Sequence, residues 1–295
     1  MSWLARFKIF SKDAGQSSGR LFISSIVVGI ISGIGAILFY TLLSWLSHTV
    51  MHVGANYFAP EPVGEASAFE PVGGAIRWWV LILAPAIGGL ISGLLVFTFA
   101  PEAEGHGTDA VIEAFHHKQG FIRKRVPFIK AISSIITIGT GGSAGREGPI
   151  AQIGAGFGSY LATTLKLTDD ERRTLMLSGA AGGIGAIFRS PLGGALFAVE
   201  VLYKRDFEAK SLIPALVSSI VAYSIFSARF GWGLMFDTPH YVFSHPVELL
   251  FYGVFGLVCA VVGIIYIKVF YGLRDHLFHR IPILPHFRPA IGGLM

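Results

Sequence analysis

Residues 139–150 read Gly-Thr-Gly-Gly-Ser-Ala-Gly-Arg-Glu-Gly-Pro-Ile, a glycine-rich run that ends in a charged pair and a proline. An apolar stretch follows, so Pro149 suits the first turn of a helix, where its missing N–H group is no loss. The preceding backbone N–H groups and the positive end of the helix dipole favour an anion site. Glu147 would compete for the same donors, which fits a gate that leaves the site when it is protonated or displaced. The alternative is a surface glutamate that is simply favourable at a helix N-terminus.

The composition of the whole chain is that of a membrane protein. Of its 295 residues, 53% are hydrophobic and only 14% are charged, and the mean hydropathy is +0.63. Ordinary soluble domains carry about 25% charged residues, so this chain has too little polar surface for a soluble enzyme and too much apolar content for a disordered one. The single cysteine, Cys259, excludes a disulfide scaffold and a cysteine-based zinc site. We therefore expect an all-α polytopic membrane protein that is not an enzyme and has no metal and no cofactor.

The basic residues indicate how the chain crosses the membrane. The net charge of +5 is divided among short clusters between apolar stretches, a pattern that predicts topology and no nucleic-acid binding. Residues 1–20 are basic and contain no cleavable signal peptide, so we expect a cytoplasmic N-terminal segment before a retained membrane helix. The absence of a targeting peptide favours a prokaryotic plasma membrane.

Four apolar stretches are long enough to be full membrane spans: residues 21–53, 78–100, 212–230 and 247–273. The loop at 54–76 has no Lys or Arg and is expected outside, with its acidic residues Glu61, Glu65 and Glu70. Basic residues at 118–130, and later at Lys204, Arg205 and Lys210, predict cytoplasmic turns.

The remaining apolar stretches are shorter than a full crossing requires: residues 126–140, 150–167, 174–188 and 192–203. Glycine-rich breaks separate several of them. Broken helices at membrane depth are tolerated where the irregular backbone is shielded by protein or lines a polar cavity. This pattern is typical of a transport site made from half-helices.

Three further segments are candidates for function. His106 lies in Glu-Gly-His-Gly-Thr-Asp, at another junction between a loop and a helix, where it is either a ligand of an anion or an ordinary loop histidine. Glu200 is an ionisable group late in an apolar stretch, which makes it a functional candidate. The small residues at 178–186 have helical spacing and predict close helix packing without chemistry.

Two motifs suggest other classes of protein. Gly-Gly-Ser-Ala-Gly at 141–145 matches the nucleophile elbow of serine hydrolases, which would make Ser143 a nucleophile, but that elbow requires a preceding strand. His116 and His117 with His106 suggest a metal site, although adjacent histidines point to different sides of a helix and no carboxylate cluster accompanies them.

A six-residue sequence occurs twice. Pro-Ala-Ile-Gly-Gly-Leu stands at 85–90 and again at 289–294, after a long span and its loop in each case. The first copy is expected to open the second span. Repeats are common in transporters, so we expect residues 231–295 to begin a second structural repeat that ends incomplete at Met295. The alternative is that this sequence is a favoured helix start that recurs by chance.

Together these segments resemble the CLC family of chloride channels and proton-coupled chloride transporters. The most specific match is Gly-Arg-Glu-Gly-Pro at 145–149, supported by Gly105-His106-Gly107 about forty residues earlier and by 190–200, Ser-Pro-Leu-Gly-Gly-Ala-Leu-Phe-Ala-Val-Glu. The resemblance covers nearly the whole chain in order and spacing.

The resemblance implies a homodimer with one pore per subunit, in which each subunit has two inverted halves of broken, tilted helices. Residues 21–230 would be the first repeat, and 192–203 and 212–230 would supply part of the dimer face. Glu147 would be the external gate. The chloride-binding residues would be Gly105, His106, Gly107, Arg146, Glu147, Gly148 and Pro149.

Three departures from the family pattern affect function. His106 stands where the family commonly has a serine, which puts selectivity and pH response in question. Val201, next to Glu200, stands where proton-coupled members have an internal glutamate. The later filter and pore residues would fall beyond Met295.

We therefore expect chloride transport across a membrane through a pore gated by Glu147, with passive conduction favoured because of Val201. A chloride/proton antiporter of the same family, a nonconducting truncated fragment and an intramembrane hydrolase using Ser143 remain alternatives.

Overall fold

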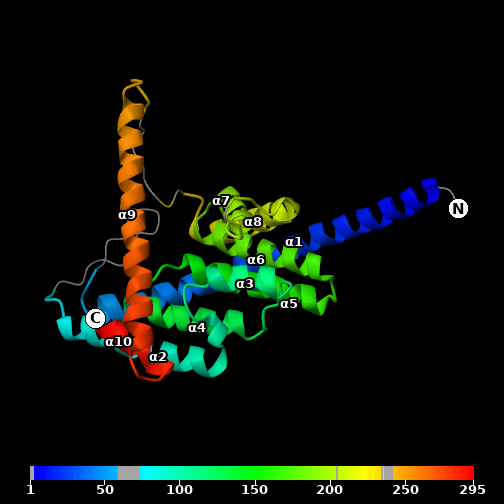
Figure 1. The fold of residues 1–295 in the computed structure, drawn as a ribbon. Coiled ribbons are helices and arrows are strands. Elements are labelled where there is room, and N and C mark those ends of the chain that lie inside the picture. The colour runs from blue at the N-terminus through cyan, green and yellow to red at the C-terminus, as the bar shows by residue number, and fades with distance from the viewer. Residues whose placement is uncertain (1–2, 59–73, 204, 234, 236–241) are drawn as a thin grey trace.

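The computed structural model describes residues 3–58, 74–203, 205–233, 235 and 242–295, which form helices and connecting loops without any strand. The α-helices are α1 (Trp3–Ser47), α2 (Trp78–Phe99), α3 (Thr108–His117), α4 (Val126–Gly139), α5 (Glu147–Thr164), α6 (Asp169–Ile187), α7 (Pro191–Glu200), α8 (Ala209–Phe230), α9 (Glu248–His276) and α10 (Arg288–Leu294). A π-helical turn (His48–Gly54) extends α1, and short 3-10 turns occur at Pro101–Ala103, Phe278–Arg280 and Pro285–Phe287. Figure 1 shows their arrangement.

Each apolar stretch expected from the sequence corresponds to one helix. Within the bundle, the largest difference between an expected and an observed helix start is at α6, and it has a clear cause. The stretch expected from residue 174 begins at Asp169, because Thr168 and Glu171 form a capping box. The Thr168 hydroxyl accepts from the Glu171 N–H group while the Glu171 carboxylate accepts from the Thr168 N–H group. This reciprocal pair satisfies backbone donors that a helix start leaves open, so polar residues ahead of the apolar stretch join the helix.

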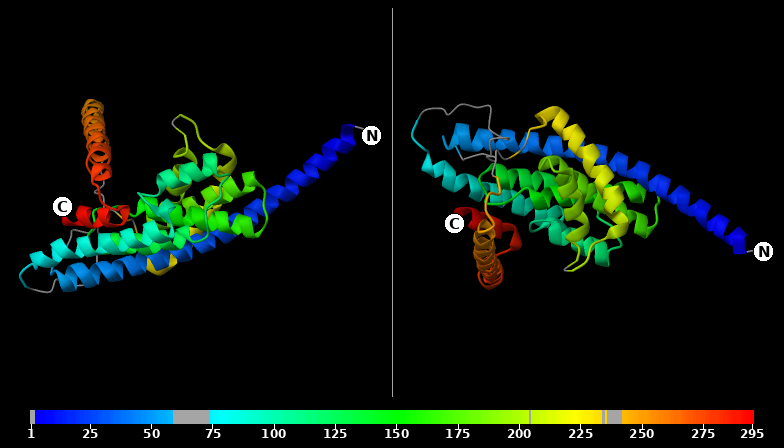
Figure 2. Two further views of the ribbon diagram at one scale, coloured as in Figure 1. Left: turned by 60° about the horizontal axis from the view of Figure 1, so that its bottom comes forward. Right: turned by 90° about the horizontal axis from the view of Figure 1, so that it is seen from above.

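The first helix begins ahead of the apolar stretch expected from residue 21. The first helix is continuous from Trp3, and its N-terminal part projects beyond the bundle (Figures 1 and 2). Among the described residues, four helical segments are long and apolar enough to cross a membrane, at 19–54, 78–99, 209–230 and 248–276. The acidic residues Glu61, Glu65 and Glu70, and the basic residue Lys204, lie outside the described part of the chain.

Helix α6 lies at the centre of the bundle and packs against α1, α5, α7 and α8. Its small residues allow this, as the sequence predicts for 178–186. A Cβ added at Gly179 would overlap the carbonyl of Gly154 on α5, and one at Gly154 would overlap the carbonyl of Gly179. Backbones that approach so closely fix α5 rigidly against the centre of the fold.

The two copies of Pro-Ala-Ile-Gly-Gly-Leu pack against each other. A Cβ at Gly89 would overlap the carbonyl oxygen of Pro289, and one at Gly293 would overlap that of Pro85. Gly89 and Gly293 are equivalent in the repeat, as are Pro85 and Pro289, so the contact is the same in both directions. The expectation that the first copy opens a helix is wrong, because Pro85 lies inside α2.

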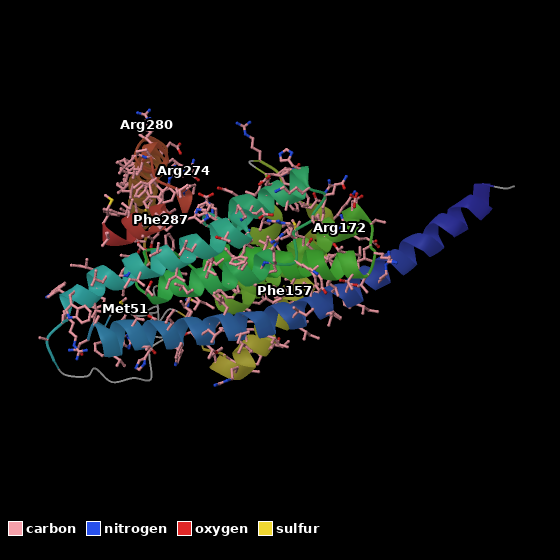
Figure 3. All side chains as sticks on the ribbon, turned by 90° about the horizontal axis from the view of Figure 1, so that it is seen from below. Met51, Phe157, Arg172, Arg274, Arg280 and Phe287 are labelled. Atoms are coloured by element: carbon pink, nitrogen blue, oxygen red, sulfur yellow. The ribbon has the colours of Figure 1, made fainter. Side chains whose placement is uncertain are left out.

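Helix α9 stands away from the bundle and has no buried residue (Figures 1 and 2). Its surface is apolar along most of its length, and its hydropathy of 2.4 equals that of the candidate spans at 19–54 and 78–99. Lipid is a favourable solvent for such a surface and water is not. The chain returns from the C-terminal end of α9, where Arg274 lies, to α10 through short turns that include Phe287 (Figure 3).

Candidate anion site

The two glycine loops singled out in the sequence meet in the structure. A Cβ added at Gly107 would lie 2.6 Å from the carbonyl oxygen of Gly148, and one at Gly148 would overlap the carbonyl oxygen of His106. Gly107 also has a φ of 106°, a conformation that L side chains rarely adopt. Both residues must therefore be glycine for the loops to touch.

Each loop leads directly into a helix N-terminus. Gly107 is the N-cap of α3, and α5 begins at Glu147. The first N–H groups with a helical acceptor are those of Val111, bonded to Gly107 at 3.2 Å, and Ile150, bonded to Arg146 at 3.1 Å. Within the described residues, the N–H groups of Thr108, Asp109 and Ala110 on α3, and of Glu147 and Gly148 on α5, have no acceptor. Two positive helix ends with open donors thus lie side by side, an arrangement that attracts an anion.

A cavity of about 980 Å³ lies beside this junction. Its walls come from α2, α4, α9, α10, the two glycine loops and the first turns of α3 and α5, including Gly105 and Pro149. The lining side chains that can carry a charge near neutral pH are Glu104, His106, Asp109, Lys130, Arg274 and Arg288. Three of these are permanent or near-permanent cations and two are carboxylates, so the lining is net positive when His106 is neutral.

Lys130, on α4, holds the glycine loop before α3 through hydrogen bonds to its backbone. Its side chain is only 3% exposed, and its Nζ atom donates to the carbonyl oxygens of Ala103 at 3.0 Å and Gly105 at 2.5 Å. The sequence reasoning missed this role, because it counted Lys130 among the basic residues of a cytoplasmic turn. The available signal was its position inside the apolar stretch 126–140, where a charged residue is a functional candidate.

Two further interactions fix the segment before α3. Gln152, which is 1% exposed, donates its Nε2 group to the carbonyl oxygen of Glu102 at 2.9 Å. The Glu102 carboxylate forms an ion pair with Arg123. Partial burial is the largest single effect and raises the pKa of Glu102. The hydrogen bond from Arg123, a backbone hydrogen bond and the charges of Arg123 and Lys118 together outweigh it, so the pKa lies below its usual value and the pair is charged at neutral pH.

His106 lines the cavity and carries its own counter-ion. The Nε2 atom of His106 lies 3.3 Å from a carboxylate oxygen of Asp109, and both side chains are substantially exposed, 47% and 69%. An exposed pair of this kind contributes little stability. Its effect is local, since Asp109 holds the imidazole at the mouth of the loop.

The side chains of Glu147 and Arg146 point in different directions. The Glu147 side chain is exposed and lies back against Gly145, where an added Cβ would overlap its carboxylate. The Arg146 guanidinium lies over the rings of Tyr40 at 5.7 Å and Phe188 at 5.8 Å, away from the cavity. Any contribution of Arg146 to an anion would therefore come from its backbone.

Of the other candidates, only Ser143 lines the cavity. Glu200 is an exposed residue at the end of α7 and Val201 is the C-cap, and neither lines the cavity. Ser143 lines it, but the described residues contain no strand from which a nucleophile elbow could form. The Nε2 atom of His116 lies 3.0 Å from the carbonyl of Leu202, and the described part of the chain has no group of three potential metal ligands.

The loop before α5 also packs against the end of α1. Met51, labelled in Figure 3, lies on the π-helical turn at the end of α1. Its side chain lies against Gly141. The φ of Gly141 is 95°, so the chain turns sharply there before it reaches the charged pair.

Comparison with known proteins identifies relatives of this fold. The family model described as voltage gated chloride channel matches residues 88–295. A ClcB-like protein of Ralstonia nicotianae is 32% identical over 228 residues, which are 75% of this chain and 52% of that protein. The H(+)/Cl(-) exchange transporter ClcA of Vibrio parahaemolyticus is 30% identical over 200 residues, 67% of this chain and 43% of that protein.

A solved structure of a CLC-type fluoride/proton antiporter has the same fold, with a TM-score of 0.77 over 94% of this chain and 63% of that one, at 24% identity. The chain spans about half the length of the curated relatives it matches.

Proposed function

The chain belongs to the voltage-gated chloride channel family, and on that basis we propose that it carries chloride or a similar anion across a membrane at the junction of α3 and α5. The observation that supports this most strongly is the contact between Gly107 and Gly148, which places two helix N-termini together. Their open N–H groups are backbone donors that replace part of the hydration shell of a small anion. Weak binding of this kind lets the ion leave again, as transport requires.

The cavity beside the junction serves as the entry path. Its net positive lining raises the local concentration of anions, and the buried ammonium group of Lys130 extends that potential to the loop at Gly105. His106 and Asp109 also line the cavity beside Gly105. Protonation of the imidazole adds a positive charge beside the path and strengthens anion binding there.

Glu147 gates the path. Its carboxylate is exposed and has no hydrogen-bond or ion-pair partner in the described part of the chain, so it is free to move. When charged, it competes with the anion for the N–H groups at the start of α5. When protonated, it releases them.

We favour passive conduction over proton-coupled exchange, because Val201 offers no carboxyl group for an internal proton step. Exchange is the second candidate, and it is favoured by the Vibrio relative, which is named an H(+)/Cl(-) exchange transporter. The two differ in a simple measurement. A chloride gradient drives proton movement in liposomes only in an exchanger.

Chloride efflux from liposomes containing the full-length protein tests the gate. Glu147→Gln should raise flux and weaken its pH dependence, because a neutral amide mimics the released state. Unchanged flux and unchanged pH dependence would refute the gate. Complete absence of flux in both proteins would favour the nonconducting alternative.

The arrangement in the membrane is part of the same proposal. We place the N-terminus in the cytoplasm of a prokaryotic cell and the chain in a homodimer. Exposed apolar side chains on α7 and α8, among them Leu192, Leu196 and Ile213, support these helices as part of the dimer face. Cross-linking in native membranes measures the dimer, and protease access to an N-terminal tag measures the orientation.

A further inference from the structure

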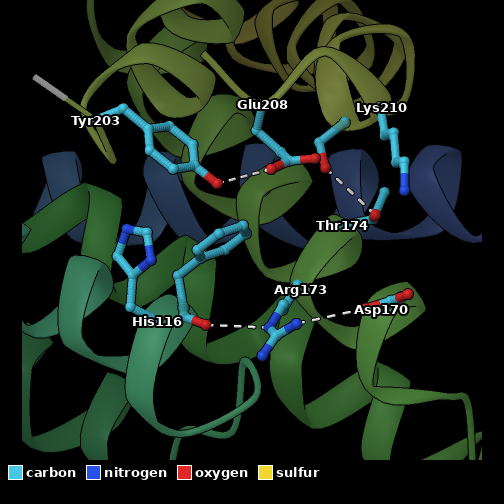
Figure 4. Close-up of a pocket in the computed structure, with 9 residues that line it drawn as sticks. His116, Asp170, Arg173, Thr174, Tyr203, Glu208 and Lys210 are labelled. Carbon is cyan, nitrogen blue, oxygen red and sulfur yellow. Dashed lines mark hydrogen bonds and ion pairs between the residues drawn. The ribbon is translucent and has the colours of Figure 1, made fainter. Parts of the chain in front are cut away.

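A second cavity lies apart from the anion path. It has a volume of about 310 Å³ and lies where the C-terminal turn of α3 meets the first turns of α6 and α8 (Figure 4). None of its lining residues lines the large cavity. The candidate span of α8 begins at Ala209, so this second cavity lies at a membrane boundary.

Its charged groups are balanced, with one open group of each sign. Arg173 donates from Nε to the carbonyl of Phe115 at 3.0 Å and from Nη1 to Asp170 at 3.4 Å, so these two charges already interact. Lys210, in contrast, has no hydrogen bond or ion pair with any residue that the structure describes. Glu208 accepts from the Tyr203 hydroxyl at 3.0 Å through one carboxylate oxygen and leaves the other without a donor in the described chain.

A buried hydroxyl proton also lacks an acceptor. The Ser211 Oγ and Thr174 Oγ1 atoms lie 3.3 Å apart, and these residues are only 2% and 8% exposed. One hydrogen bond between two hydroxyls uses one of their two protons. Over the described residues the second proton has no acceptor, and both side chains line the cavity. A buried donor without a partner is unfavourable, so an oxygen atom of a bound ligand would stabilise the Ser211–Thr174 pair by accepting this proton.

Aromatic rings form the wall near Glu208. Tyr203 lies edge-on to His116, with ring centroids 5.2 Å apart, and to Phe115, 6.3 Å apart. The face of such a ring attracts an ammonium group, especially beside a carboxylate. The cavity therefore offers donors near Lys210 and Thr174, and acceptors with aromatic surface near Glu208 and Tyr203.

We propose that this cavity binds a small zwitterion of the phosphoethanolamine type. Its phosphate accepts from Lys210 and from the spare hydroxyl proton of Thr174 and Ser211, and its ammonium group donates to the open carboxylate oxygen of Glu208, beside the Tyr203 ring. A simple anion would face Glu208 and Asp170, and a simple cation would face Lys210 and Arg173, so only a ligand with both charges is complemented throughout. The same chemistry is found in a free phosphoethanolamine and in the headgroup of phosphatidylethanolamine.

The test is a thermal titration of the full-length protein in nanodiscs of phosphatidylglycerol, which carry no amine headgroup. Added O-phosphoethanolamine should raise the unfolding midpoint saturably, while inorganic phosphate or ethanolamine alone should raise it much less. Lys210→Gln and Glu208→Gln should each weaken the apparent affinity by about tenfold, since each removes one charge-assisted hydrogen bond. Lys124→Gln removes the same charge from an exposed lysine outside the cavity and should leave the affinity unchanged.

Nanodiscs that contain phosphatidylethanolamine distinguish the two sources. If the lipid is the natural occupant, free phosphoethanolamine should no longer shift the midpoint there. If a free zwitterion is the occupant, the shift should persist. The proposal is overturned if no saturable shift occurs in phosphatidylglycerol, if Lys210→Gln binds like the unmodified protein, or if inorganic phosphate acts as strongly. These readouts measure binding, so they are independent of the proposed anion flux.

Discussion

The contact between the glycine loops can be broken by one methyl group at Gly107. A Cβ there would lie 2.6 Å from the carbonyl oxygen of Gly148, which is backbone and must move by several tenths of an ångström to restore normal contact. Overpacking of this kind destabilises by about 1–3 kcal/mol. The φ of 106° adds about 1–2 kcal/mol for any L side chain. Gly107→Ala should therefore lower stability by about 2–5 kcal/mol in total.

Gly105 is the matched control in the same loop. Its φ of 73° is also left-handed, but a Cβ there would have no heavy atom within 4 Å. Gly105→Ala should therefore show the conformational cost alone, about 1–2 kcal/mol. Thermal unfolding of the two variants separates the clash from the strain, and liposome flux shows its consequence.

Gly107→Ala should also reduce anion flux well below that of Gly105→Ala, because it separates the two helix N-termini. Equal unfolding midpoints and equal flux in the two variants would refute the contact between the loops as the basis of the site.

Four further predictions follow from named contacts. Lys130→Met should lower stability by about 1–3 kcal/mol in thermal unfolding, because two loop carbonyls lose their donor. Glu171→Gln should flatten the pH dependence of the unfolding midpoint below pH 4.5. Partial burial raises the pKa of Glu171, but bonds from Arg20 and Thr168 lower it further, so its stabilisation is present above 4.5 and is lost as the pH falls. Gly89→Val and Gly293→Val should each destabilise by about 1–3 kcal/mol, with the double variant less affected than the sum, because both open one interface. His106→Ser should change the permeability ratios among anions.

Each of these four predictions would be contradicted by a specific outcome. Stability of Lys130→Met equal to that of Lys124→Met would mean that the buried ammonium does not hold the loop. An acid profile of Glu171→Gln that matches the unmodified protein would remove Glu171 from acid unfolding. Strict additivity of the two valine variants would show that the repeat copies do not share a contact. Identical permeability ratios after His106→Ser would show that the ring does not face the ion.

The sequence predicts the helices well, because apolar content and length are local properties. Every expected apolar stretch corresponds to a helix, and the shortness of 126–140 and 192–203 is matched by helices of 14 and 10 residues. The sequence predicts a helix start at Pro85, because the first turn of a helix is the position that proline favours. In the structure Pro85 lies inside α2, where the packed surroundings of a membrane protein tolerate it.

The candidate site depends on contacts that no local pattern contains. Gly107 and Gly148 were each recognised as part of a helix start, but their contact follows from the packing of α3 against α5. Lys130 was assigned by its sequence neighbours to a basic turn, whereas its side chain reaches back to a loop about 25 residues earlier. The second cavity depends on the meeting of α3, α6 and α8, and no sequence motif marks it.

Bromide is the most direct probe of the proposed path, because it resembles chloride and scatters anomalously. In crystals of the full-length protein soaked in bromide, we predict an anomalous peak at the junction of α3 and α5, within hydrogen-bond reach of the open N–H groups beside Gly107 and Gly148. In Glu147→Gln crystals we predict a further or stronger peak where the carboxylate had lain. Anomalous peaks elsewhere in the protein, with none at this junction, would contradict anion passage between these helix ends.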